Sequence, residues 1–189
     1  LIRLLESRRS TRGPLHPITL GTMNNLGALY QVQQKYDKAL PLAEEVLKLR
    51  RSSLGEEHVE TLNAMSNLAF VYAAMDRESD AQDLLAKALP ATRRSLGPEH
   101  PRTYIMMQGL GMLYARLQKW EEAEKLLHEA LALQTKVDGA ENPQTLRTAY
   151  VLALMYSRGG RLAEGEKLLL PTLASQRRLL KPNDRDLVR

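Results

Sequence analysis

Three histidines recur along the chain at a constant interval. His16, His58 and His100 are 42 residues apart, and Asn142 and Asp184 continue the series. Regularly spaced imidazoles suggest a metal site, because histidine is a common metal ligand. However, asparagine and aspartate fill the same place before a predicted helix, where both are good caps. Successive repeats would also hold these residues about 10 Å apart, too far to share one ion. We therefore interpret them as helix caps and predict no metal site.

No other group of residues has the spacing of a catalytic site. Adjacent carboxylates such as Glu44 and Glu45 occur where exposed helix or loop charge is ordinary. The chain has no Gly-x-Ser-x-Gly, no phosphate-binding glycine-rich loop and no His-Glu-x-x-His. It has no cysteine, which excludes disulfides and favours a reducing compartment, so we expect a cytoplasmic location. We predict no catalytic residue, no enzyme activity and no cofactor.

The same interval extends to residues that build a core. Leucines and tyrosines recur at four places each: Leu26, Leu68, Leu110 and Leu152, and Tyr30, Tyr72, Tyr114 and Tyr156. A fixed period of this size indicates a stack of copies of one small unit, in which each copy covers its neighbour's apolar face. Such an array is typical of proteins that hold a partner and do not transform a substrate.

The composition favours helices. Apolar residues make up 43% of the chain, enough for a core, and aromatic residues only 5%, which disfavours a β-sandwich. The longest apolar runs are far shorter than a membrane span, so we expect no membrane partner. The formal charge of +5 permits an acidic partner without requiring one.

Each repeat is predicted to form two antiparallel helices, A and B. In the second repeat, an apolar stripe of helical period runs from Leu62 to Tyr72. The segment around Asp76 interrupts it, and a second stripe begins at Ala81. This stripe ends before Gly97, which stands where a left-handed residue is expected past the end of a helix.

Small residues recur at one place on each helix, where helices can approach closely. These are Gly27, Ala69, Gly111 and Ala153 on helix A, and Ala39, Ala81, Ala123 and Gly165 on helix B. Alternation of small and large residues at fixed places in two helices is the tetratricopeptide pattern, whose usual period is about 34 residues.

The longer repeat found here resembles that of kinesin light chains and of related arrays in bacterial and fungal multidomain proteins. The resemblance rests on Thr61-Leu62, Ser66-Asn67-Leu68-Ala69, Tyr72, Ala81, Leu84-Leu85, Ala88-Leu89 and Leu96-Gly97-Pro98-Glu99-His100-Pro101. It implies an all-α, right-handed superhelical tetratricopeptide solenoid of antiparallel helix pairs. In such arrays helix A lines the concave surface and helix B the outer one.

We expect a single array without an internal linker, and a fragment of a longer one. Its parts are the end of a preceding helix B (1–15), four repeats (16–57, 58–99, 100–141 and 142–183) and the start of a further repeat (184–189).

Residues of helix A that avoid the core stripe are expected to point into the groove and to bind a peptide. They are Asn24, Asn25, Asn63, Asn67, Phe70, Gln108, Met112, Arg116, Arg147, Tyr150, Leu154 and Arg158.

Two sets in this group are in register. The resemblance implies that Asn25 and Asn67 bond the backbone of an extended peptide, for which an amide supplies a donor and an acceptor. A plain solvated face is the alternative, and both remain open. Phe70, Met112 and Leu154 are the second set; we expect them to pack against the neighbouring repeat, with an exposed apolar strip as the alternative.

The second half of the groove is expected to be basic because of Arg116, Arg147 and Arg158. This polarity suits a ligand with an acidic part, and kinesin light chains take tryptophan–acidic cargo peptides. The resemblance therefore implies an acidic segment in the partner.

Arginine pairs recur near the end of helix B: Arg8-Arg9, Arg50-Arg51, Arg93-Arg94 and Arg177-Arg178. They would stabilise the negative end of the helix dipole, or form a basic edge that binds phosphates or nucleic acid. We favour the first interpretation.

The predicted function is that of a scaffold or adaptor that binds an extended peptide segment of a protein partner in the concave groove. The alternative is a regulatory or sensor module of a larger multidomain enzyme or nucleotide-binding switch protein. End-to-end self-association through uncapped terminal helices is a further expectation for the fragment.

Overall fold

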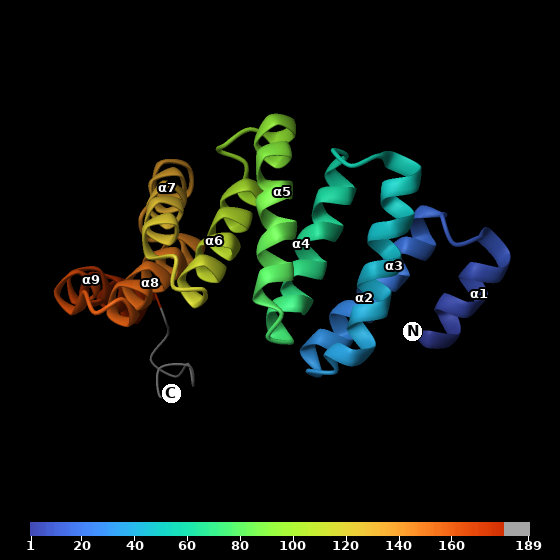
Figure 1. Ribbon diagram of the computed structural model, residues 1–189, viewed down its shortest axis with the longest axis horizontal. Coiled ribbons are helices and arrows are strands. Elements are labelled where there is room, and N and C mark those ends of the chain that lie inside the picture. Colours follow the sequence, from blue (N-terminus) through green and yellow to red (C-terminus); the bar gives the residue numbers. More distant parts are fainter. Residues whose placement is uncertain (180–189) are drawn as a thin grey trace. The chain divides into compact units, whose positions relative to one another are not determined.

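The computed structural model describes residues 1–179, which form nine α-helices and no strand (Figure 1). The helices are α1 (Ile2–Arg12), α2 (Pro17–Val32), α3 (Tyr36–Leu54), α4 (Val59–Ala74), α5 (Glu78–Leu96), α6 (Pro101–Arg116), α7 (Trp120–Asp138), α8 (Pro143–Arg158) and α9 (Leu162–Leu179). The prediction of an all-α chain is confirmed. No helix within these residues is long and apolar enough to cross a membrane.

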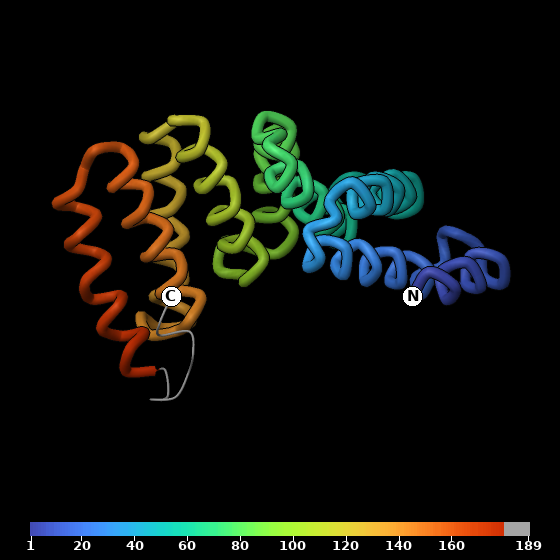
Figure 2. The backbone as a smooth tube through the Cα atoms, turned by 90° about the horizontal axis from the view of Figure 1, so that it is seen from below, coloured from blue at the N-terminus to red at the C-terminus, as the bar shows by residue number. Residues whose placement is uncertain are grey.

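The chain folds as two compact units, Leu1–Ser95 and a second that begins at Leu96. In the first unit α3 packs against both α2 and α4, and in the second α7 packs against α6 and α8, while α8 also packs against α9. Within each unit the chain reverses direction from one helix to the next, as the tube in Figure 2 shows. Each unit is therefore built from helical hairpins.

The short loops between helices A and B share one backbone conformation. A residue of positive φ closes each of them: Gln34 (φ 56°), Asp76 (φ 57°), Gln118 (φ 59°) and Gly160 (φ 79°). The N–H of the next residue donates to the carbonyl of the tyrosine five positions earlier, as in the 2.9 Å bond from Arg77 to Tyr72. This 6→1 bond is that of a Schellman motif, which satisfies the last carbonyls of helix A.

The longer loops between repeats also recur. Gly13, Gly55, Gly97 and Gly139 have φ between 82° and 90°. Gly55 combines φ 86° with ψ 169°, a region essentially restricted to glycine. The expectation of a residue with positive φ past helix B is thus confirmed, although at Gly55 the conformation is extended and not the left-handed helical one.

The histidines cap helices, as predicted. The Nδ1 atoms of His16, His58 and His100 accept the N–H two residues later, at 3.1–3.2 Å. Asn142 does the same with its Oδ1, at 2.8 Å. Asp184, the fifth member of the series, lies outside the described residues.

The small residues at the helix crossings are buried, which confirms close approach of helices A and B. At Gly111, an added Cβ would lie 2.7 Å from Leu127 Cγ. At Gly165, it would lie 2.9 Å from the backbone oxygen of Ala153. At both places glycine is required by space.

Candidate functional site

The second unit presents two A helices side by side. Helices α6 and α8 contact each other directly. The amide Nε2 of Gln108 on α6 donates a 2.9 Å hydrogen bond to Thr148 Oγ1 on α8, and both residues are buried. This bond holds the two helices in register, so the residues on either side of it form one surface.

Gln108 corrects a prediction. It was expected to point into the groove, but its exposed fraction is only 6%. The reason is that α8 covers this position of α6, and Thr148 takes up the amide. Tyr150, which occupies the same place in the next repeat, is 39% exposed. Gln108 is therefore a contact between repeats and not a binding residue.

The apolar residues in register also differ from the prediction. They were expected to pack against the neighbouring repeat, but Phe70 is 56%, Met112 41% and Leu154 37% exposed. On α6, helix α8 covers Gln108, one turn before Met112, and leaves Met112 in solvent. The alternative of exposed apolar residues on helix A is thus the correct one.

We define the α6–α8 face as the exposed residues on the outward sides of these two helices. They are Ile105, Met112 and Arg116 on α6, and Arg147, Tyr150, Leu154 and Arg158 on α8. Four of these seven are large apolar or aromatic side chains.

The charge of this face has one sign. Helices α6 and α8 contain four arginines, Arg102, Arg116, Arg147 and Arg158, and neither aspartate nor glutamate. Within residues 1–179, Arg147 and Arg158 have no ion-pair partner. The α6–α8 face is therefore an apolar surface flanked by cations, and it can attract an acidic ligand.

The first unit presents amides. Asn25 on α2 and Asn67 on α4 are exposed, and neither side chain forms a hydrogen bond with another residue in the part of the chain described. Asn24 and Asn63 are half-buried, and Asn63 Nδ2 lies 3.4 Å from Glu60 Oε1. Asn25 and Asn67 are the amides that remain available to a ligand.

A polar network that the sequence did not reveal joins α7, α8 and α9. Tyr156 donates to Glu124 Oε1 at 2.7 Å, and His128 Nε2 lies 2.6 Å from the same hydroxyl. Arg161 pairs with Glu124 at 2.5 Å and with Glu164 at 2.9 Å. The partner of His128 is Tyr156 on the next helix, 28 residues away, which is why the sequence around His128 does not reveal it.

The network shifts the pKa values of its members. Burial, followed by the hydrogen bond to Glu124, raises the pKa of Tyr156 to about 12. The hydrogen bonds from Tyr156 and Arg161 lower the pKa of Glu124. These shifts keep Tyr156 protonated and Glu124 ionised at neutral pH, which indicates a structural role. Its sequence signal was the recurrence of Tyr72 and Arg77 as Tyr156 and Arg161.

The arginines near the end of helix B are largely neutralised. Arg50 is only 7% exposed and pairs with the Glu60 carboxylate at 2.7 Å. Arg51 pairs with Glu56 at 2.8 Å. Glutamates in register hold further cations, in the pairs Glu57–Arg94, Glu99–Lys136 and Glu141–Arg178. This pairing disfavours the phosphate-binding edge and supports a structural role.

Comparisons with known proteins agree with this architecture. The family described as Tetratricopeptide repeat matches residues 18–94, 61–117 and 103–178. The crystal structure of a putative kinesin light chain from P. anserina, with nearly identical TPR-like repeats, is 26% identical. It has a TM-score of 0.79 and the match covers 95% of this chain and 85% of that one; a variant of it has a TM-score of 0.81.

More distant structures share the fold alone. BtubC (BKLC) from P. vanneervenii is 23% identical with a TM-score of 0.76, and the match covers 88% of this chain and 67% of that chain. The apo form of RapI is 15% identical with a TM-score of 0.79, and the match covers 94% of this chain and 62% of RapI. No curated protein sequence matches the chain.

The predicted fold class is confirmed by these matches. The fold is typically a non-catalytic scaffold for protein interactions, and its members bind protein or peptide partners. The chain belongs to the tetratricopeptide repeat family, and its array is of the kinesin light chain type.

Proposed function

We propose that the chain is a scaffold that binds an extended, acidic segment of a partner polypeptide on the α6–α8 face. The observation that carries this proposal is that the α6–α8 face combines three arginines with four exposed apolar side chains, on two adjacent helices that contain no carboxylate. An uncharged or mixed surface would suit many ligands, whereas this one selects apolar residues followed by carboxylates.

The energetics favour a weak complex. Burial of about 200 Å² of apolar surface on Ile105, Met112, Tyr150 and Leu154 contributes about 5 kcal/mol. Carboxylates beside Arg147 and Arg158 add about 0.2–1 kcal/mol each, because these pairs are exposed. Ordering a flexible peptide opposes both contributions. The net binding free energy stays below the roughly 8 kcal/mol of a micromolar complex, so a dissociation constant above about 1 μM is expected.

In the first unit, we propose that Asn25 and Asn67 bond the backbone of a bound peptide. Their exposure and the absence of other hydrogen-bond partners within residues 1–179 support this role. A carboxamide pairs with both the N–H and the C=O of a peptide group, so recognition would not depend on the ligand's sequence. We also propose the division into four repeats of 42 residues, supported by helix starts at Pro17, Val59, Pro101 and Pro143.

Fluorescence anisotropy tests the α6–α8 face. The probe is a labelled peptide of leucine, glycine and aspartate, compared with the same peptide carrying asparagine in place of each aspartate. The variant Arg147→Glu/Arg158→Glu should weaken binding of the acidic peptide about tenfold or more, because two favourable charge pairs become repulsive.

The matched control is Lys125→Glu/Arg177→Glu. It makes the same change in net charge at two exposed cations on α7 and α9, away from the proposed face. Equal weakening by this control, or equal affinity for the acidic and asparagine peptides, would contradict the proposal.

Capture of a peptide library tests the asparagines separately. We expect the Asn25→Ala/Asn67→Ala variant to retain less peptide than the wild type, because two backbone contacts are lost. Unchanged capture would contradict the proposed role of Asn25 and Asn67. It would not affect the proposal for the α6–α8 face.

A further inference from the structure

A hollow of about 550 Å³ lies on the surface of the first unit, between α3 and α4. Its floor is apolar and consists of Leu47 and Leu68, each only 3% exposed. Its walls are polar and consist of Glu44, Lys48, Arg51, Ser52 and Tyr72. A volume of this size lies in the range of small-ligand sites, which are typically apolar with a few polar groups.

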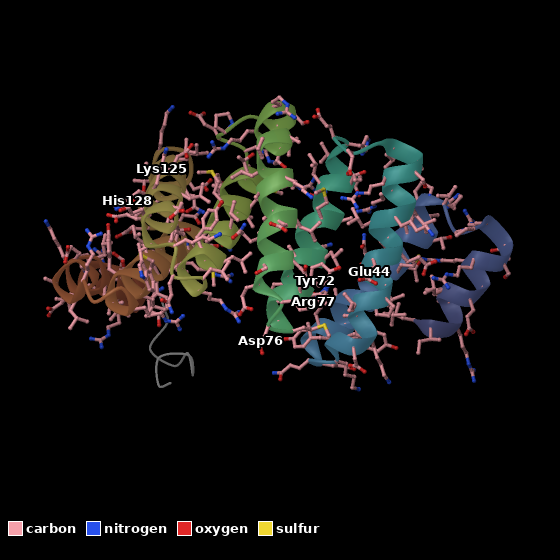
Figure 3. The ribbon with its side chains drawn as sticks, in the orientation of Figure 1. Glu44, Tyr72, Asp76, Arg77, Lys125 and His128 are labelled. Atoms are coloured by element: carbon pink, nitrogen blue, oxygen red, sulfur yellow. The ribbon has the colours of Figure 1, made fainter. Side chains whose placement is uncertain are left out.

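The hollow follows the axis of α3. Glu44, Lys48, Arg51 and Ser52 are spaced by four, three and one residues, so they share one side of the helix. The rise from Glu44 to Ser52 is about 12 Å, enough for three or four residues of an extended chain. Figure 3 shows Glu44 near Tyr72, whose hydroxyl donates to it at 3.1 Å, with Arg77 beside them.

In the second unit, side chains occupy the position that corresponds to this hollow. His128 on α7 stands in register with Glu44, and Tyr156 with Tyr72. The His128 and Tyr156 rings meet edge to face with centroids 6.1 Å apart, and Tyr156 is only 5% exposed. Glu44 has no aromatic ring to pack against Tyr72, and Tyr72 is only half-buried. Glu44 thus leaves the place beside Tyr72 open, whereas in the second unit His128 lies against Tyr156.

One of the two cations on the wall is specific to this repeat. Lys48 has the uncharged counterparts Pro90, Ala132 and Ala174, so the fold does not need a positive charge at its place. Arg51 belongs to the repeat pattern and recurs as Arg9, Arg93 and Arg177. Lys48 is exposed and has no ion-pair partner within the described chain. Arg51 pairs with Glu56, whose side chain is 63% exposed, and such a pair is weak enough for a ligand anion to compete with it.

We propose that this hollow binds a partner polypeptide through one apolar side chain, placed over Leu47 and Leu68, and a nearby carboxylate, placed between Lys48 and Arg51. Charge complementarity and the apolar floor specify this ligand. Glu44 at the opposite end accepts the Tyr72 hydroxyl and disfavours a second carboxylate there. The site involves only α3 and α4 and is separate from the α6–α8 face.

Nuclear magnetic resonance of the ¹⁵N-labelled protein tests the proposal. The probe is N-acetyl-leucyl-glycyl-aspartyl amide, and its asparagine analogue is the matched control ligand. We expect saturable shifts in the millimolar range for backbone amides around Lys48, Arg51 and Tyr72. The asparagine analogue should bind about fivefold more weakly, since it loses interactions with two exposed cations.

Two protein variants complete the design. Lys48→Glu/Arg51→Glu should abolish the saturable shifts, and Lys125→Glu/Arg177→Glu should leave them unchanged. Both pairs lie on exposed sides of helices, so the substitutions should leave the protein folded. The spectra themselves show whether each variant is folded. Shifts that persist in Lys48→Glu/Arg51→Glu, equal binding of the two ligands, or no saturable shift at these amides would each overturn the proposal.

Discussion

Gly27 and Gly111 occupy the same place in two repeats, near the same point of helices α2 and α6. Their surroundings differ. A Cβ on Gly27 would find its nearest contact at 3.9 Å, on Leu42, which is ordinary van der Waals distance. A Cβ on Gly111 would lie 2.7 Å from Leu127 Cγ and 2.9 Å from its Cδ2. In register with Leu127, the first repeat has Ala43, which explains the space around Gly27.

The two Gly→Ala variants should therefore have opposite effects. Alanine in a helix interior is favoured over glycine by about 1 kcal/mol, so Gly27→Ala should increase the free energy of unfolding by about that amount. At Gly111 the same gain is opposed by overpacking against the fully buried Leu127, which costs about 1–3 kcal/mol. Gly111→Ala should therefore be destabilising by up to about 2 kcal/mol.

Urea unfolding followed by circular dichroism measures both changes. A double-mutant cycle with Leu127→Ala supplies the control, because truncation of Leu127 removes the clash. In that background Gly111→Ala should become stabilising by about 1 kcal/mol, which gives a coupling of about 1–3 kcal/mol. If Gly111→Ala stabilises the wild type as much as Gly27→Ala does, the close-packing argument is refuted.

Three further predictions concern loops, caps and pH. Gln118→Gly should stabilise the protein by about 1 kcal/mol in urea unfolding, because Gln118 has φ 59° and glycine adopts this conformation without steric cost; an unchanged midpoint would count against it. His58→Ala should cost about 0.5–2 kcal/mol through loss of the cap on Glu60 N–H, whereas His58→Asn should cost little; equal losses would exclude capping. Burial raises the pKa of Tyr104 to about 12, as it does that of Tyr156, so ultraviolet titration should show tyrosines that ionise about two pH units above the others. Because the folded pKa of Tyr104 exceeds its unfolded value near 10, its stabilising contribution is complete below pH 10 and disappears as the pH rises through 12; a Tyr104→Phe variant that loses stability equally over this range would contradict the assignment.

Local features of the fold were predictable from the sequence because they depend on near neighbours in the chain. A cap requires only a side-chain acceptor and the N–H two residues later, so His16 and Asn142 could be assigned from their position before a helix. The small residues at Gly111 and Gly165 followed from the repeat and the need for close helix approach.

Contacts between repeats were harder to predict because they depend on two side chains far apart in the sequence. Gln108 is buried because Thr148, 40 residues later, lies opposite it. His128 acquires Tyr156 as a partner in the same way. In both cases the repeat pattern identifies the place but does not determine which side chain the neighbouring helix presents there.

The candidate site was predicted in part. The exposure of Asn25, Asn67, Arg147 and Arg158 agrees with the expectation that they lie off the core stripe of helix A. The hollow beside Tyr72 was not foreseen, because the residue at the place of Glu44 differs in every repeat and is Ala86, His128 and Leu170 in the others.

The central claim, that the α6–α8 face binds an acidic segment, is tested most directly by titrating the ¹⁵N-labelled protein with the leucine–glycine–aspartate peptide. Our account predicts that the largest saturable shifts in the second unit fall on backbone amides of α6 and α8, near Met112, Arg147 and Leu154. Shifts concentrated on α7 and α9, with α6 and α8 unaffected, would contradict it.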